Sequence, residues 1–74
     1  MTAAQLLRTL KTVPFRPFEM HLVDGRGIAV RHPELVALEG GGRLAKVLNA
    51  EEVDEIVDVL TIVSLRPLTE REIY

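Results

Sequence analysis

The most constraining feature of this chain is the segment from Pro14 to Arg26, in which two prolines precede an alternating run that ends near an Asp-Gly pair. The proline rings restrict the backbone ahead of the run. Phe18, Met20 and Leu22 then alternate with other residues, which predicts a β-strand with one buried face. An Asp-Gly pair after such a strand predicts a tight turn. The segment therefore opens a small antiparallel β-structure and assembles no catalytic site.

The register of this hairpin follows from which side chains must share a face. A two-residue turn would mix apolar and polar side chains on both faces. A three-residue turn that ends at Gly25 places the large apolar side chains together. Met20 then pairs with Ile28, and the next pair on that face is Phe18 with Val30. Because a slip of one residue turns the whole strand over, we predict the second register, with a positive φ at Gly25.

Short elements are predicted along the rest of the chain. Thr2 and Gln5 form a capping-box pattern ahead of leucines at helical spacing, which predicts an amphipathic helix over 3–11. The acidic segment 49–55 is expected to form a helical turn or a loop, and Asp58 is expected to cap a tight turn. Strands are predicted at 18–22, 27–32, 35–39, 43–48 and 62–66, with a glycine turn at 40–42 and one helical turn in the tail.

These elements predict a single domain of the α+β class over residues 1–74. The helix at 3–11 is followed by an antiparallel β-meander over 18–66, with about five short strands, and by a charged tail at 67–74. The strands follow one another too closely for parallel crossovers. We therefore expect a small SH3-like or Sm-like barrel, or a strongly bent sheet.

The apolar content is large for such a short chain. Of the 74 residues, 47% are apolar, and most of these are aliphatic. A domain of this size has a small interior, and small domains without disulfides often gain stability by association. We therefore predict that part of the apolar surface is buried against a partner, either a second copy in a homo-oligomer or another protein.

Composition excludes several other classes. The chain has no cysteine, which excludes a disulfide framework and a thiolate metal site. The net charge of −2 argues against a protein that coats nucleic acid. No run approaches the ~20 apolar residues of a membrane span. We expect a cytoplasmic protein without a membrane association.

One family resemblance is carried by the run Pro14-Phe15-Arg16-Pro17-Phe18, by Asp24-Gly25-Arg26 and by His32-Pro33-Glu34. This pattern resembles a set of short bacterial proteins of uncharacterised function, common in planctomycete-type genomes, which read roughly PFRPFxIxLxDGRxxxVxHPE. The resemblance covers about residues 14–65. It implies a complete small protein and carries no activity.

A second resemblance is to Sm-like and other SH3-like small barrels. These also place a helix before five bent strands, with a turn like that at 22–26 after the first strand. The chain departs from Sm proteins after its second strand, where His32-Pro33-Glu34 replaces their RNA-contacting Asp-x-x-x-Asn pattern. The resemblance implies the fold, and RNA binding is not carried over with it.

No motif points to an enzyme. Ser64 lies within an apolar run without a nearby base, and the glycines at 40–42 lack the pattern of a phosphate loop. His21 and His32 do not have metal-ligand spacing. We predict no catalytic residue, no metal, no cofactor and no small-molecule substrate.

Two sets of residues remain as candidates for binding a partner. The first is apolar and would bury a helix face or a sheet edge against a protein; it consists of Leu6, Leu7, Leu10, Phe15, Ile62 and Leu65. The second belongs to the alternative, a small nucleic-acid-binding regulator that contacts phosphates through surface arginines. It consists of Arg26, Arg31 and Arg43, which are expected to gather on one surface.

Overall fold

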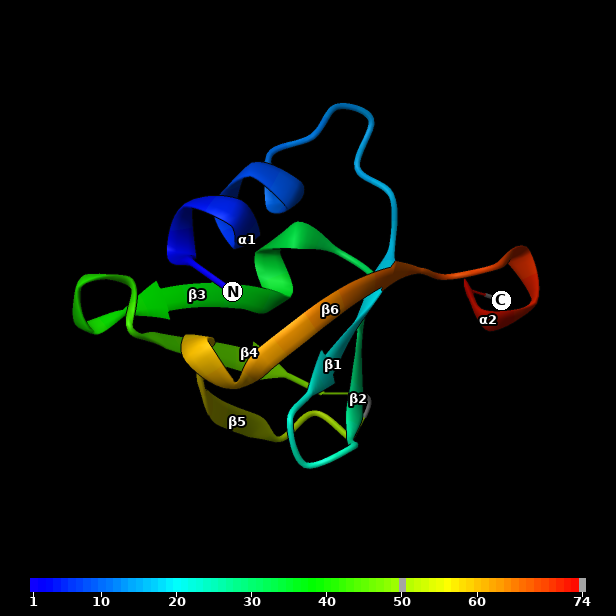
Figure 1. Cartoon of the computed structure of the whole chain (residues 1–74). Helices are drawn as coiled ribbons and strands as arrows, with labels where there is room; N and C mark the ends of the chain where they lie inside the picture. Colours follow the sequence, from blue (N-terminus) through cyan, green and yellow to red (C-terminus); the bar gives the residue numbers. More distant parts are fainter. Residues whose placement is uncertain (50, 74) are drawn as a thin grey trace.

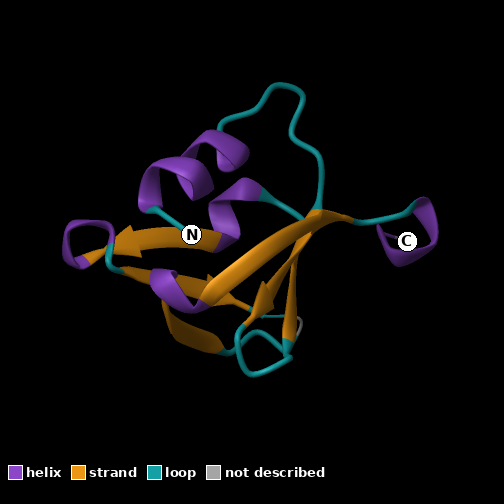
Figure 2. Ribbon diagram, viewed as in Figure 1, coloured by secondary structure: helices purple, strands orange, loops and turns teal. Residues whose placement is uncertain are grey.

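The computed structural model describes residues 1–49 and 51–73, which form one helix at the start of the chain, six strands and a short terminal helix (Figures 1 and 2). The α+β class is confirmed. The elements are α1 (Ala3–Leu10), β1 (Phe18–Leu22), β2 (Gly27–Val30), β3 (Val36–Glu39), β4 (Leu44–Leu48), β5 (Asp54–Asp58), β6 (Ile62–Pro67) and α2 (Glu70–Ile73), with 3₁₀ turns η1 (Pro33–Leu35), η2 (Gly40–Gly42) and η3 (Val59–Thr61).

The strands form two antiparallel sheets of three strands each. One sheet has the order β2-β1-β6 and the other has the order β3-β4-β5. The second sheet is a meander, but the last strand departs from the predicted meander because it returns to lie beside β1 (Figure 1). The tight turn η3 connects the two sheets at this point. Asp58 is the N-cap residue of this turn, as predicted. Its side chain accepts a hydrogen bond from the Leu60 N–H at 2.9 Å.

The hairpin β1–β2 has the predicted three-residue register. Met20 lies opposite Ile28, and Phe18 lies opposite Val30. All four side chains are buried, so the alternation of the sequence does define the core face. Gly25 has a φ of +91°, as the turn requires.

The helix α1 covers one side of the core with its leucines. The side chain of Thr2 accepts the Gln5 N–H, and the Gln5 side chain accepts the Thr2 N–H, so the predicted capping box is present. Leu6 and Leu10 are buried against the sheets. The first turn of the helix lies close to the glycine turn η2, because a Cβ atom added to Gly42 would lie 2.7 Å from the Cβ of Ala3.

The acidic segment differs from the prediction. It was expected to be a helical turn or a loop up to residue 55, and the strand β5 begins at Asp54 instead. The side chain of Asn49 accepts hydrogen bonds from the N–H groups of Glu51 and Val53, which turns the chain back along β4. Pairing with β4 then stabilises β5 as a strand. Three of its five residues are acidic, so the sequence shows no apolar alternation that would predict this strand. Residue 50, within the predicted segment, and residue 74, at the end of the predicted tail, lie outside the described residues.

Among the described residues, thirteen buried apolar side chains form the core, and they come from α1, from both sheets and from the turn η3. Met20, Val30, Val47 and Ile62 are fully enclosed. In the described part of the chain, no helix has the length and apolar character needed to cross a membrane.

Candidate interaction surface

Half of the apolar residues proposed for partner binding lie inside the protein. Leu6 and Ile62 are fully buried, and Leu10 is 9% exposed. All three belong to the core, so their proposed role in an interface is wrong for this structure. These residues were chosen for their helical spacing and strand alternation. Such apolar periodicity marks the face of an element that packs into the core of its own domain.

The other three predicted apolar residues are exposed to different degrees. Leu7 is 40% exposed. The Phe15 ring is half-buried and packs against Phe18, with ring centroids 6.0 Å apart and an interplanar angle of 59°. Leu65 is also half-buried against the core. Leu7 is therefore the one predicted partner residue with a large free surface in the described structure.

The sequence did not predict several apolar side chains that are exposed in the structure, because no periodic pattern distinguishes them from loop residues. Val13 is 92% exposed in the loop between α1 and β1, and Ile56 is 64% exposed on the outer side of β5. The remaining large exposed apolar residues are Val23, Leu44, Val53, Leu60 and Val63. The expectation that the aliphatic content exceeds what the core encloses agrees with these exposures.

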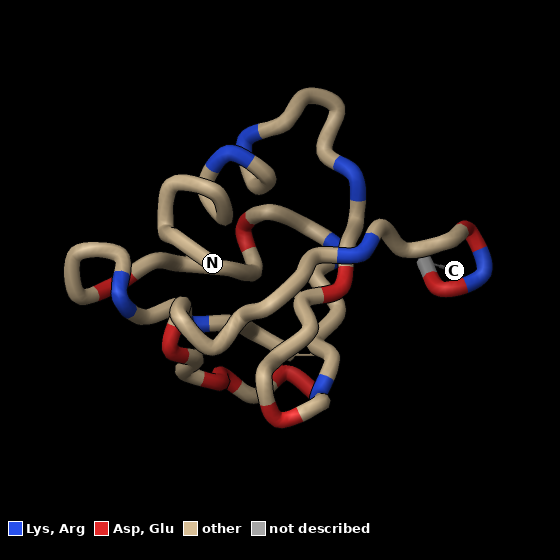
Figure 3. Tube along the Cα trace, in the orientation of Figure 1, with Lys and Arg blue, Asp and Glu red and all other residues tan. Residues whose placement is uncertain are grey.

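A group of basic residues at the start of the chain and a group of acidic residues at 51–58 lie on opposite sides of the molecule, with other charges of both signs elsewhere (Figure 3). Residues 1–18 contain three basic and no acidic side chains, whereas residues 51–58 contain five acidic and no basic side chains. We call the first group the basic loop surface; it consists of Arg8, Lys11 and Arg16 around Val13. We call the second group the acidic edge; it consists of Asp54, Glu55 and Asp58 on β5. All three cations of the basic loop surface are exposed, and none forms an ion pair within residues 1–49 and 51–73.

The strand β5 has a free backbone edge. The N–H of Val59 donates to the Arg43 carbonyl and the N–H of Asn49 donates to the Val53 carbonyl, so the odd-numbered residues of β5 face β4. The backbone groups of Asp54, Ile56 and Asp58 therefore point away from the sheet. The carbonyl of Asp58 accepts the Thr61 hydroxyl, at 2.7 Å. The N–H and C=O groups of Asp54 and Ile56 are left for a partner strand.

The next strand in the sequence, β6, is protected at both ends of its outer edge. The carbonyl of Ile62 accepts a hydrogen bond from the Met1 amine at 2.9 Å, and the Ile62 N–H donates to the Val59 carbonyl. Pro67 has no N–H to offer. The free edge of β5 is thus the better template for an added chain.

An ion-pair bridge connects β5 to the β1–β2 hairpin. Asp24 accepts the backbone N–H of Arg26 at 3.0 Å and contacts its Nε at 3.2 Å. This orients the guanidinium so that it donates to Glu55 at 2.9 Å. The Arg26 hydrogen bond, followed by one from Asn49, lowers the pKa of Glu55, and the backbone N–H of Arg26 lowers the pKa of Asp24. The Asp-Gly-Arg sequence therefore links the two sheets.

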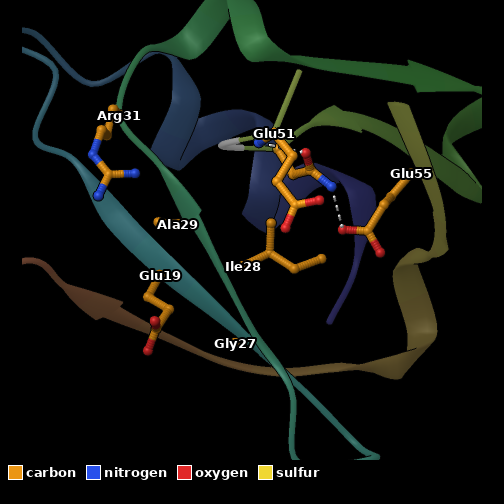
Figure 4. A pocket seen from close by; sticks show the side chains of 8 residues that line it. Glu19, Gly27, Ile28, Ala29, Arg31, Glu51 and Glu55 are labelled. Atoms are coloured by element: carbon orange, nitrogen blue, oxygen red, sulfur yellow. Dashed lines mark hydrogen bonds between the residues drawn. The ribbon is translucent and has the colours of Figure 1, made fainter. Parts of the chain in front are cut away.

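Two hollows lie between β5 and the hairpin. One, of about 170 Å³, is lined by Val23 and Ile56 together with the charged residues Asp24, Arg26 and Asp58. The other has a volume of about 300 Å³ (Figure 4). Its lining includes Glu19, Arg31, Asn49, Glu51 and Glu55.

The three arginines expected to contact phosphates do not gather. Arg26 is occupied by the bridge to Glu55, and Arg31 donates to the backbone carbonyl of Glu72 at 3.0 Å. Arg43 lines a third hollow beside the start of α1. Each of the three lines a different hollow. The structure therefore does not place them around one common hollow, and their contact with phosphate stays a prediction.

A second polar cluster fixes the tail to the first sheet. Arg66 contacts Glu72 at 2.7 Å and Glu19 at 3.4 Å, and Glu19 also contacts the His21 ring at 2.8 Å. The Arg66 guanidinium lowers the pKa of Glu72 to about 2. Across the described residues, no three His, Cys, Asp or Glu side chains come together as a metal-binding group would require.

The fold and this surface define a small α+β protein with a free acidic strand edge and a basic loop on the opposite side. Comparison with protein-family models, with curated proteins and with solved structures finds no match for this chain.

Proposed function

We propose that this protein is a non-enzymatic module that associates with itself through its two oppositely charged sides. The observation that carries the proposal is the segregation of charge between the basic loop surface and the acidic edge. Complementary patches on opposite sides of one molecule favour head-to-tail contacts between copies.

Exposed apolar side chains at both sites support the proposal. Val13 lies between the cations of the loop, and Ile56 lies between Asp54 and Asp58 of the edge. Complete burial of one aliphatic side chain contributes roughly 1.5–3 kcal/mol. Charge alone contributes little between exposed groups. The apolar centre of each site therefore supplies the stability, and the surrounding charges supply the orientation.

We also propose that the fold is an SH3-like or Sm-like barrel and that the protein is cytoplasmic. A helix ahead of the strands, a 3₁₀ turn before the last strand and the return of β6 to β1 support an SH3-like or Sm-like barrel. The lack of cysteine supports a cytoplasmic location. The separation of Arg26, Arg31 and Arg43 favours a protein partner over nucleic acid.

Measurement of molar mass across a concentration series tests the proposal. We expect the weight-average mass to rise above the 8.3 kDa of one chain as concentration increases. We also expect added salt to lower the mass, because the orienting charges are exposed. A mass of one chain at every concentration and at low salt would refute self-association. A rise in mass that occurs only when an oligonucleotide is added would instead support the nucleic-acid alternative.

A further inference from the structure

The free edge of β5 and the loop after α1 have matching patterns of charge and apolar side chains. Along the edge, Ile56 is flanked two residues away on each side by Asp54 and Asp58. In the loop, Val13 is flanked by Lys11 two residues before it and by Arg16 three residues after it. Each site therefore has an apolar centre between two charges, and the charges are opposite in sign.

We propose that the loop 11–16 of one copy docks on the free edge of β5 of a second copy. This inference rests on the proposed self-association and names the two surfaces that carry it. Val13 of the loop lies over Ile56, where its N–H donates to the Ile56 carbonyl and its carbonyl accepts the Ile56 N–H. The cations of the loop then pair with the carboxylates at the two ends of the edge.

Val13 lies at a bend of the loop and offers the edge one free pair of backbone groups. Within the described residues, the N–H and C=O of Val13 make no backbone hydrogen bond in their own chain. The following residue, Pro14, lacks an N–H, so it leaves no unpaired donor next to the Val13–Ile56 pair. Pro14 and Pro17 also restrict the loop, which lowers the entropy lost on docking.

The spans of the two patterns are compatible. Asp54 and Asp58 are four residues apart on an extended strand, which is about 13 Å. Four residues separate Lys11 from Arg16 on a loop that bends at Val13 and Pro14, so their long side chains supply the reach to the two carboxylates. Asp54 already contacts the Nζ of Lys46 at 3.6 Å, a long and exposed pair, so it remains accessible to a second cation.

The positions of the two surfaces determine the kind of assembly. The loop projects beyond α1 at one end of the molecule, and β5 lies at the other end (Figure 1). One chain therefore cannot satisfy its own edge. A head-to-tail contact of this kind generates a closed ring or an open filament. A symmetric β5–β5 pairing centred on Ile56 is disfavoured, because it would place Asp54 opposite Asp58 of the other copy.

Charge exchange between the two surfaces tests the proposal. The loop variant carries Lys11→Glu and Arg16→Glu, whose side chains are exposed. The edge variant carries Asp54→Lys and Asp58→Asn; the asparagine retains an oxygen that can accept the Leu60 N–H. Arg71→Glu, in the exposed tail, is the control for a reversed charge elsewhere. Circular dichroism of each full-length variant checks that it is folded, and sedimentation measures its mass.

We expect each double variant to associate at least about tenfold more weakly than the natural chain, a change of ~1.4 kcal/mol or more. An equimolar mixture of the two variants is expected to recover a higher mass, because the natural basic loop of the edge variant then meets the natural acidic edge of the loop variant. Val13→Ser and Ile56→Ser are expected to weaken association as well, and Val63→Ser, on β6, is not.

The outcomes separate this inference from the proposed function. If the natural chain is monomeric at every concentration, the proposed function fails and this inference fails with it. If the natural chain associates and both double variants associate equally well, self-association stands and the assignment of these two surfaces is overturned. Recovery of mass only in the mixture supports the assignment.

Discussion

The contact between the glycine turn η2 and the start of α1 provides the sharpest test of the fold. Gly42 has a φ of +91°, and a Cβ atom added to it would lie 2.7 Å from the Cβ of Ala3. The Ala3 atom is attached directly to the helix backbone, so it can move away only if the helix moves. Substitution of Gly42 by alanine therefore strains the backbone and also forces α1 away from the turn.

The chain contains a matched control for the first of these effects. Gly25 has the same φ of +91°, and an added Cβ would meet no heavy atom within 4 Å. Gly25→Ala therefore incurs only the conformational cost of a left-handed residue, roughly 1–2 kcal/mol. Gly42→Ala adds an overpacking cost of about 1–3 kcal/mol. The expected totals are ~1–2 kcal/mol at Gly25 and ~2–5 kcal/mol at Gly42.

Urea denaturation followed by circular dichroism measures both free energies of unfolding. Thermal unfolding provides a second readout, since each kcal/mol lowers the Tm of a domain this small by roughly 4–8 °C. Ala3→Gly in the Gly42→Ala background should restore the contact and recover most of the difference, less ~0.5–1 kcal/mol for a glycine in the helix. Equal destabilisation at Gly25 and Gly42, or no recovery, would refute the packing of α1 on η2.

Three further predictions follow from burial and charge. Met20 is fully buried, so Met20→Ala should lower the free energy of unfolding by about 2–5 kcal/mol; Ile56→Ala, at an exposed position, should change it by about 0.5 kcal/mol or less, and equal losses in urea titrations would contradict the core described above. Removal of the Arg26 guanidinium by Arg26→Gln should raise the pKa of Glu55 toward its usual range, as followed by carboxyl-carbon NMR; an unchanged pKa would argue against the bridge between the sheets. Folding lowers the pKa of Glu72 from 4.5 to about 2, so its contribution to stability is present above pH 4.5 and is lost as the pH falls toward 2; Glu72→Gln should flatten that part of the stability–pH curve, and an unaltered curve would exclude the pairing with Arg66.

Local patterns in the sequence determined the elements in the first half of the chain. The capping box at Thr2 and Gln5 marked the start of α1, and the alternation that begins at Phe18 determined the hairpin register and the positive φ of Gly25. These features depend on residues only a few positions apart. Their energies are decided by backbone geometry and by which face is apolar, and both can be read without the rest of the fold.

The tertiary structure decided what the sequence alone left open. The strand β5 carries acidic residues at three of its five positions, and it forms because β4 supplies its hydrogen-bond partners. Arg26 meets Glu55 across 29 residues, and this contact gives a bridge where the sequence suggested a site for phosphate. Leu6 and Leu10 of α1 entered the core, whereas Leu7, Val13 and Ile56 stayed outside it. Which apolar side chains remain exposed depends on how the two sheets and the helix pack together, because burial is a property of the assembled core and not of spacing along one element.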